Sequence, residues 1–284
     1  MEIAVISGKG GSGKSSISAA FMSLFPQVVA IDCDVDASNL YLLFQPHNEK
    51  TFSFVTGRHA VVNSDNCISC GKCFSLCRFD AIKIEKAAVI DEINCDGCGL
   101  CARFCPVNAI SMKAVDKSMI YIGTFRYGIM IYGRLAPGEE NSGKMVSELR
   151  RLSSEIVKGK ESIIVLDGPP GIGCPVMSTI TGVDKVIVVT EPTLSGFSDL
   201  SRTIDLVRSR QLPVYVIINK CSLNKRISNE INRWCNQESI PVIASLPFDR
   251  QMIDALVAGK TIVEYNPNSE IAKSLKKALS DMIN

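Results

Sequence analysis

A glycine-rich run near the start of the chain constrains the fold more than any other feature. Residues 8–15 read GKGGSGKS and satisfy the Walker A pattern. They follow the strand-like segment Glu2 to Ile6 and precede a helical segment from Lys14 to about Leu24. Strand, glycine-rich loop and helix in this order are typical of a phosphate-binding loop. We therefore predict a site for ATP or ADP made of Gly8, Gly10, Gly11, Ser12, Gly13, Lys14, Ser15 and Ser16.

The two polar side chains after the last glycine have separate expected roles. Lys14 can reach the outer phosphates, and the Ser15 hydroxyl can hold Mg²⁺. Further strand-like segments, each separated by helix-length stretches, lie at Val28–Ile31, Ser162–Leu166, Lys185–Val189 and Val214–Ile218. This alternation predicts an α/β fold, a P-loop NTPase with a mostly parallel sheet covered by helices.

Eight of the twelve cysteines fall into two short runs with the spacing C-x2-C-x2-C-x3-C, which is typical of bacterial ferredoxins. In two-cluster ferredoxins the fourth cysteine of each run ligates the other cluster. We therefore expect two 4Fe-4S clusters, one held by Cys67, Cys70, Cys73 and Cys105, the other by Cys95, Cys98, Cys101 and Cys77. Zinc is the alternative, although it prefers two well-separated pairs of ligands.

The cysteine-rich region interrupts the strand and helix alternation between about Gly57 and Lys117. It contains an internal repeat, because residues 66–73 (NCISCGKC) resemble residues 94–101 (NCDGCGLC). We predict an inserted small α+β domain of the bacterial ferredoxin type over 58–116, and a P-loop ATPase domain over 1–57 and 117–284. The segment Pro137 to Gly143 is expected to be a loop of the ATPase domain.

Charge and hydropathy exclude several classes of protein. Lysine and arginine number 31 against 29 acidic residues, so a net charge of +2 gives no reason to expect nucleic acid as a partner. No apolar stretch reaches the roughly 18 residues of a membrane span, and no leader is apparent. Cysteines with metal-ligand spacing favour a reducing compartment. We therefore expect a cytoplasmic protein.

The early lysine of the loop, Lys9, is not required by the Walker A pattern itself. With it, the sequence resembles the deviant Walker A family that includes MinD, ParA, the nitrogenase iron protein and the Mrp or ApbC scaffold ATPases. The resemblance implies that ATP is sandwiched in a dimer, with itself or with a related chain, and that Lys9 acts on the partner's nucleotide. It also implies that Asp34 orients the attacking water and that Asp167 supports Mg²⁺, with Asp32 and Asp36 as rivals that could instead cap a turn.

Other positions carry weaker signals. Asn219 resembles the family's base-recognising asparagine, and Pro247 and Asp249 resemble its second nucleotide-edge loop. Cys174 lies seven residues after Asp167, where the nitrogenase iron protein has a cluster ligand, but no second cysteine of that kind is present, so a buried or helix-start cysteine is the alternative. An amphipathic segment from Asn268 onward is expected to dock on the body rather than on a membrane.

Together these features predict an ATPase in which ATP-driven switching is coupled to electron transfer through two clusters to a client protein. The resemblance is to MinD-type ATPases with an inserted ferredoxin domain. Two alternatives stay open: a carrier of iron-sulfur or metal clusters, and a MinD-like positioning switch whose clusters tune it.

Overall fold

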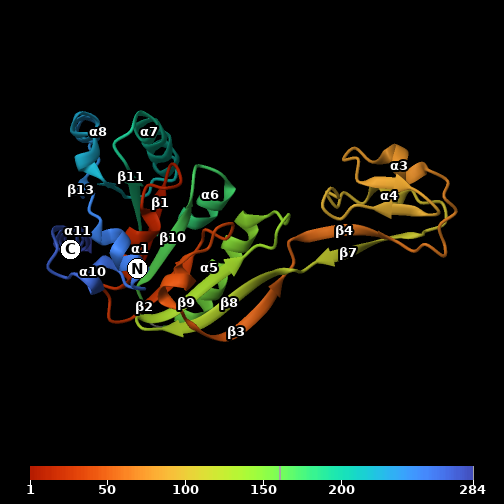
Figure 1. Cartoon of the computed structure of the whole chain (residues 1–284), viewed down its shortest axis with the longest axis horizontal. Helices are drawn as coiled ribbons and strands as arrows, with labels where there is room; N and C mark the ends of the chain where they lie inside the picture. The colour runs from red at the N-terminus through yellow and green to blue at the C-terminus, as the bar shows by residue number, and fades with distance from the viewer. Residues whose placement is uncertain (160, 284) are drawn as a thin grey trace. The chain divides into compact units, whose positions relative to one another are not determined.

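The structure, a computed structural model, describes residues 1–159 and 161–283, which divide into two compact units (Figure 1). The larger unit comprises Met1–Thr51, Ile120–Arg134 and the described residues from Ser142 onward. The smaller unit comprises Phe52–Met119 and Leu135–Asn141.

A twisted sheet forms the centre of the larger unit. Within the described residues it has nine strands in the order β13-β12-β11-β1-β10-β2-β9-β8-β3. The strands from β13 to β9 all pair in parallel, and β8 and β9 form a hairpin. Their bounds are β1 Glu2–Ser7, β2 Val28–Asp32, β3 His47–Phe54, β8 Ser118–Phe125, β9 Gly128–Arg134, β10 Ile164–Pro170, β11 Lys185–Thr190, β12 Val214–Ile218 and β13 Val242–Ser245.

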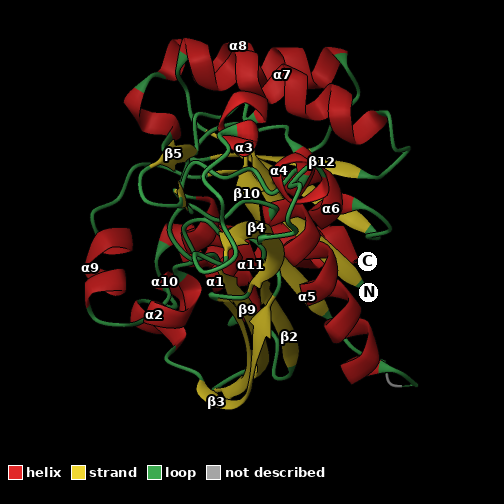
Figure 2. Cartoon of the chain, turned by 90° about the vertical axis from the view of Figure 1, so that its right-hand side faces the viewer, coloured by secondary structure: helices red, strands yellow, loops and turns green. Residues whose placement is uncertain are grey.

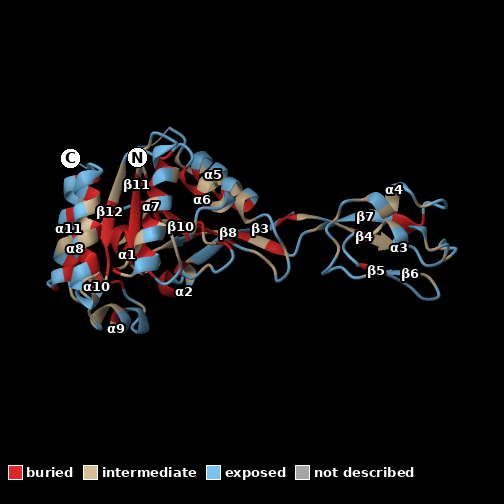
Figure 3. Ribbon diagram, turned by 90° about the horizontal axis from the view of Figure 1, so that it is seen from above, coloured by how far each residue is buried: buried red, intermediate tan, exposed pale blue. Residues whose placement is uncertain are grey.

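Helices cover both faces of this sheet, which explains why its central strands are apolar on both sides (Figure 2). On one face α1 packs with α10 and α11, and on the other α5 and α6 pack against β2, β9 and β10, beside α7. Burial is accordingly concentrated in the strands between the helices (Figure 3). The helices of this unit are α1 Lys14–Met22, α2 Leu40–Phe44, α5 Ser142–Val157, α6 Cys174–Ile180, α7 Leu194–Arg208, α8 Lys225–Gln237, α9 Gln251–Val257, α10 Ile262–Tyr265 and α11 Glu270–Ile283. The strand and helix alternation predicted from the sequence is therefore present.

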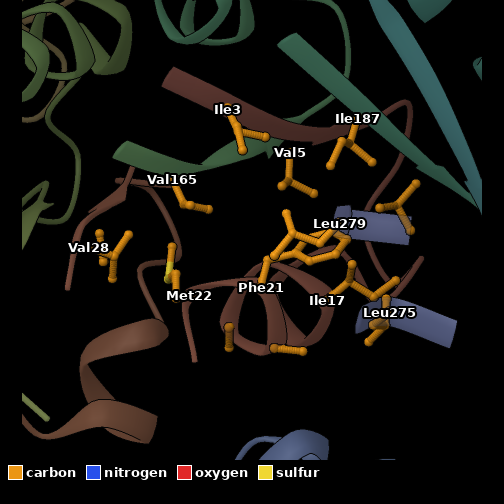
Figure 4. Close-up of a cluster of buried hydrophobic side chains, with 14 of the residues drawn as sticks. Ile3, Val5, Ile17, Phe21, Met22, Val28, Val165, Ile187, Leu275 and Leu279 are labelled. Carbon is orange, nitrogen blue, oxygen red and sulfur yellow. The ribbon is translucent and has the colours of Figure 1, made fainter. Parts of the chain in front are cut away.

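The C-terminal helix α11 belongs to the core of the larger unit. Its apolar residues Leu275 and Leu279 pack with Ile17 and Phe21 of α1 beneath the sheet (Figure 4). The segment that is amphipathic in the sequence forms this helix, and its apolar face is buried. This agrees with the expectation that the segment docks on the body of the protein. In the described part of the chain, no helix combines the length and the apolar character needed to cross a bilayer.

The smaller unit is an α+β arrangement of two antiparallel ribbons and two short helices. The ribbon of β4 (Gly57–Val62) and β7 (Ile110–Val115) and that of β5 (Ile82–Ile84) and β6 (Ala88–Ile90) enclose a small core. The helices α3 (Lys72–Leu76) and α4 (Leu100–Arg103) each begin within a cysteine run, after Gly71 and Gly99, whose φ angles are 73° and 76°. The internal repeat of the sequence is thus a repeat of local structure.

One segment lies in a different unit from the one we expected. Leu135–Asn141 belongs to the smaller unit, not to the larger one. The reason is a set of side-chain bonds: Glu139 accepts hydrogen bonds from the hydroxyls of Thr56, at 2.9 Å, and Ser118, and Asn141 Nδ2 donates to the Thr56 carbonyl at 2.8 Å. These bonds join positions more than 20 residues apart, so spacing along the chain gave no sign of them.

Candidate nucleotide site and cysteine cavities

The glycine-rich loop has the backbone of a phosphate cradle. Gly11 and Gly13 have φ angles of 81° and 87°, which side-chain-bearing residues rarely adopt, and α1 begins directly afterwards at Lys14. A Cβ atom on Gly13 would collide with the amide of Asn219. The hydroxyl of Ser12 is buried and has no hydrogen-bond partner among the described residues. The loop thus offers a buried donor and a turned backbone to an anion.

Lys14 is paired with an acidic residue at the carboxyl end of the neighbouring strand. Its Nζ lies 2.8 Å from Asp167 Oδ1, 3.2 Å from Ser15 Oγ and 4.0 Å from Asp34 Oδ2. Burial alone would lower the pKa of Lys14, but the charge and hydrogen bond of Asp167 outweigh it and raise the pKa. The predicted residues Lys14, Ser15, Asp34 and Asp167 are therefore brought together.

The three aspartates at the end of β2 and directly after it lie in different environments. Asp32 is buried and accepts hydrogen bonds from Ser38 Oγ at 2.8 Å and from the Leu40 amide, so it caps the start of α2. Burial and the nearby charge of Asp167 raise the pKa of Asp32 to about 7. Asp34 faces Lys14, whereas Asp36 is exposed. This arrangement favours Asp34 over its rivals for contact with a bound nucleotide.

Lys9 is held by a residue that the sequence analysis missed. Glu191 follows β11 and contacts two lysines, Lys9 at 2.7 Å and Lys220 at 3.0 Å. Burial opposes the charge on Glu191, but its bonds to the two lysines lower its pKa. Lys9 Nζ also donates to Thr193 and Ser195 at 3.1 Å. The one sequence signal for Glu191 was its position, as a single acidic residue directly after an apolar strand.

The other predicted nucleotide contacts have local structural roles. Asn219 is buried, and its Nδ2 donates to the Ser12 carbonyl at 2.8 Å, so it supports the loop. Asp249 accepts from the Gln251 amide at 2.9 Å and caps the first turn of α9. Pro247 lies before it in the loop between β13 and α9. Recognition of a nucleotide base by these residues stays a prediction.

The eight clustered cysteines line two separate cavities in the smaller unit. One is lined by Cys67, Cys70, Cys73 and Cys105, and the other by Cys77, Cys95, Cys98 and Cys101. Their empty volumes, counted with space open to solvent, are about 340 and 360 Å³ respectively. Each cavity therefore takes three cysteines from one run and the fourth cysteine from the other.

Backbone amides point at two of the sulfurs. Ala88 N lies 3.5 Å from Cys67 Sγ, and Ala109 N lies 3.2 Å from Cys105 Sγ. The hydrogen bonds from Ala88 and Ser69 lower the pKa of Cys67, whereas burial raises the pKa of Cys73 and Cys101. Within residues 1–159 and 161–283, no three His, Cys, Asp or Glu side chains are close enough to hold a single metal ion. The four thiolates of a cubane each bind a different iron, so they need not meet at one point.

The four cysteines outside these runs differ in accessibility. Cys33 and Cys235 are buried, and burial raises the pKa of both thiols. Cys221 is half-buried. Cys174 is exposed at the first residue of α6, beside Gly143. Cys174 is therefore a helix-start cysteine, which was one of the alternatives for it, and it is not buried.

Comparison with known proteins identifies the family. Residues 3–262 match the CobQ/CobB/MinD/ParA nucleotide binding domain, so the chain belongs to this family of P-loop proteins. An uncharacterized protein of Methanocaldococcus jannaschii is 38% identical over 280 residues, 98% of this chain and 94% of that protein. The iron-sulfur cluster carrier protein of Aquifex aeolicus is 25% identical over 60% of this chain and 52% of its own length.

A solved structure supports the same assignment of the fold. The septum site-determining protein MinD of Pyrococcus horikoshii, complexed with Mg-ADP, superposes with a TM-score of 0.61 at 18% identity, over 99% of this chain and 95% of that one. The superfamily and the mostly parallel α/β fold predicted from the Walker A loop and Lys9 are thereby confirmed.

Proposed function

We propose that the protein binds and hydrolyses ATP, dimerises around it, and couples this switching to electron transfer by two 4Fe-4S clusters in the smaller unit. In this proposal the domain of residues 58–116 has the bacterial ferredoxin organisation. Residues 1–57 and 117–284 form the ATPase domain, apart from Leu135–Asn141, which belong to the smaller unit. The family membership supports nucleotide binding. Contacts within each unit support the proposed hydrolysis, dimerisation and electron transfer.

The observation that carries the cluster proposal is the division of the cysteines between the two cavities. Each cavity has three cysteines from one run and one from the other, which is the ligand pattern of a two-cluster ferredoxin. Amide donors to Cys67 and Cys105 are the kind of contact that tunes cluster potentials. Clusters held there would supply storage and release of single electrons.

The nucleotide chemistry follows from the buried pair of Lys14 and Asp167. A bound triphosphate would attract the Lys14 ammonium to its outer phosphates and leave Asp167 and Ser15 to support Mg²⁺. Mg²⁺ would supply neutralisation of the charge that develops on the transferred phosphoryl group. Asp34, near Lys14 but partly open to solvent, would orient the attacking water. The orphaned hydroxyl of Ser12 gains a phosphate partner in this arrangement.

The dimer requires a change at Lys9. Its present contacts with Glu191, Thr193 and Ser195 are all within one chain. In the proposed sandwich Lys9 leaves Glu191 and reaches the nucleotide of a second copy or of a related chain. This exchange would be favourable because contacts with phosphate would replace the partly exposed ion pair between Lys9 and Glu191.

A cluster carrier is the second candidate, and two observations favour it. The chain is similar to an iron-sulfur cluster carrier protein, and Cys174 is exposed on the nucleotide-binding body. In a carrier, Cys174 from two subunits would hold a labile additional cluster, and ATP would control its transfer to a client. This function predicts iron bound beyond the two resident clusters.

Anaerobic electron paramagnetic resonance of the dithionite-reduced protein tests both functions. We expect two interacting 4Fe-4S signals that change on addition of Mg-ATP and are the same in Cys174→Ser. Loss of a further signal in Cys174→Ser would favour the carrier. If the two signals did not change on addition of Mg-ATP, ATP hydrolysis would not be coupled to electron transfer. The function would then be that of a nucleotide-dependent switch. Iron quantification alongside decides whether the clusters are present at all.

A further inference from the structure

We infer that the surface around one of the two cysteine cavities is a docking site for an acidic electron-carrier protein, which donates one electron at a time to this chain. The inference rests on the proposed function, because it assumes a cluster in that cavity. The surface surrounds the cavity of Cys67, Cys70, Cys73 and Cys105, and we call it the basic mouth. It consists of Ile68, Lys72, Ile84, Lys86, Arg103 and Val107.

The apolar part of the basic mouth is exposed to solvent. Ile68, Ile84 and Val107 line the cavity and expose 61%, 37% and 38% of their surfaces. Next to them Cys70, one of the expected ligands, is itself exposed. Exposed apolar side chains gathered around a cofactor cavity are typical of a surface that a partner covers for part of the time.

The basic part consists of three residues next to the cavity wall, Lys72, Lys86 and Arg103. Lys72 Nζ and the Arg103 guanidinium lie 5.8 and 5.9 Å from the centre of the Phe104 ring, so both cations gather beside Cys105. The carbonyl of Lys86 accepts a hydrogen bond at 2.8 Å from Ser69, which lines the cavity. All three cations are exposed, and none forms an ion pair with any residue that the structure describes.

Acidic residues near this mouth are fewer than its cations. Asp65 precedes Cys67, and Glu85 precedes Lys86, whereas the cavity wall contains no charged residue among those described. The other cavity differs, because Asp96 is part of its wall and Arg78 and Asp80 offset one another after Cys77. The two cavities thus present different charge to an approaching protein, and only one is flanked by an excess of cations.

Charge complementarity then selects the partner. A small carrier with carboxylates around its own redox centre would be steered to the basic mouth, and its apolar contact would be with the three exposed aliphatic side chains. Cys67, Cys70, Cys73 and Cys105 would hold a cluster there, which would take up one electron while the carrier would be oxidised by one electron. No bond is formed or broken, and no proton is needed for charge balance within the step.

Binding of an acidic bacterial 2[4Fe-4S] ferredoxin to the intact protein tests the inference. The variant Lys72→Glu/Lys86→Glu/Arg103→Glu is compared with Lys113→Glu/Lys273→Glu/Lys276→Glu, which makes the same charge change at exposed positions outside either cavity. We expect calorimetric affinity at low salt to fall at least about 10-fold in the first variant and to change by less than about threefold in the second. In the unaltered protein, affinity should fall as sodium chloride is added.

A second readout separates docking from damage to the cluster. Reduced methyl viologen, a small cation, should reduce the first variant at least as fast as the unaltered protein, while reduction by the ferredoxin slows. Equal affinity in both triple variants, or a salt-independent affinity in the unaltered protein, would overturn the inference. Absence of iron from the purified protein would instead remove the proposed function, so the two failures are distinguishable.

Discussion

Lys14 Nζ lies 2.8 Å from Asp167 Oδ1, and both side chains are almost completely buried, with 6% and 2% of their surfaces exposed. Ser18 Oγ donates to the same carboxylate oxygen at 2.7 Å. The start of α1 and the strand β10 are thus joined by a charge pair that water hardly screens. A buried pair of this kind is costly to break from one side only, because the remaining charge has no partner.

Lys14→Ala should abolish ATP hydrolysis and also destabilise the protein without nucleotide. We expect a loss of about 3–5 kcal/mol in the free energy of unfolding, because Asp167 would stay buried without its cation. Urea unfolding followed by the fluorescence of Trp234, the single tryptophan of the chain, measures this for the larger unit. Lys9→Ala is the control, since Lys9 is 29% exposed and its loss should cost no more than about 1 kcal/mol. Wild-type protein that contains clusters but hydrolyses no ATP would contradict the proposed activity.

Glu191→Gln should strengthen the ATP-dependent dimer. The substitution removes two ion pairs and leaves Lys9 with only its hydrogen bonds to Thr193 and Ser195 within its own chain. If Lys9 must leave Glu191 before it reaches a second subunit, its release should lower the dimer dissociation constant by about 3–10-fold. Sedimentation velocity with a non-hydrolysable ATP analogue measures it, with Glu148→Gln on the outer face of α5 as the matched control. A weaker dimer would show that Glu191 supports the interface instead.

The cysteine assignment predicts which double substitutions share a cluster. Cys67 and Cys105 line one cavity, so Cys67→Ser/Cys105→Ser should lose only half of the cluster iron. Cys67→Ser/Cys77→Ser affects both cavities and should lose nearly all of it. Iron content and the paramagnetic signals of the reduced proteins distinguish the two. If the first pair lost both clusters and the second lost one, ligation would follow the runs of the sequence instead.

Features of this protein that depend on local sequence motifs could be predicted, whereas features that depend on contacts between distant residues could not. The loop, the central strands and the pairing of cysteines from two runs follow from local motifs, and the structure has each of them. The edge strand β3 was not predicted, because all of its positions but the last are exposed and give no apolar pattern. The hairpin β8–β9 was not predicted either, although both of its strands contain apolar, buried positions. Glu191 was missed because its two lysine partners lie 182 and 29 positions away, where sequence spacing carries no information.

The ion pair between Arg126 and Glu264 should make the free energy of unfolding depend on pH in the acid range. Arg126 Nε donates to Glu264 Oε1 at 2.6 Å, and Tyr127 Oη donates to the same oxygen at 2.7 Å. Burial alone would raise the pKa of Glu264, but the bonds from Arg126, the Thr261 amide and Tyr127 outweigh it and lower the pKa from 4.5 to about 2. These contacts tie the β8–β9 turn to α10 in the larger unit.

Because the folded pKa of Glu264 is depressed, its stabilisation is present above the unfolded pKa near 4.5 and is lost as the pH falls toward 2. We expect Glu264→Gln to be less stable than the wild type by about 1–2 kcal/mol at pH 7, after allowance for solvent screening of the half-exposed Arg126. This difference should shrink through the window from pH 4.5 to 2, because the wild-type carboxyl then becomes neutral like the amide. Urea midpoints of the two proteins, read from Trp234 fluorescence at several pH values, measure the difference directly. A gap that stays constant from pH 7 to the acid end of the window would show that the glutamine disturbs packing at α10 and that the charge of Glu264 contributes nothing.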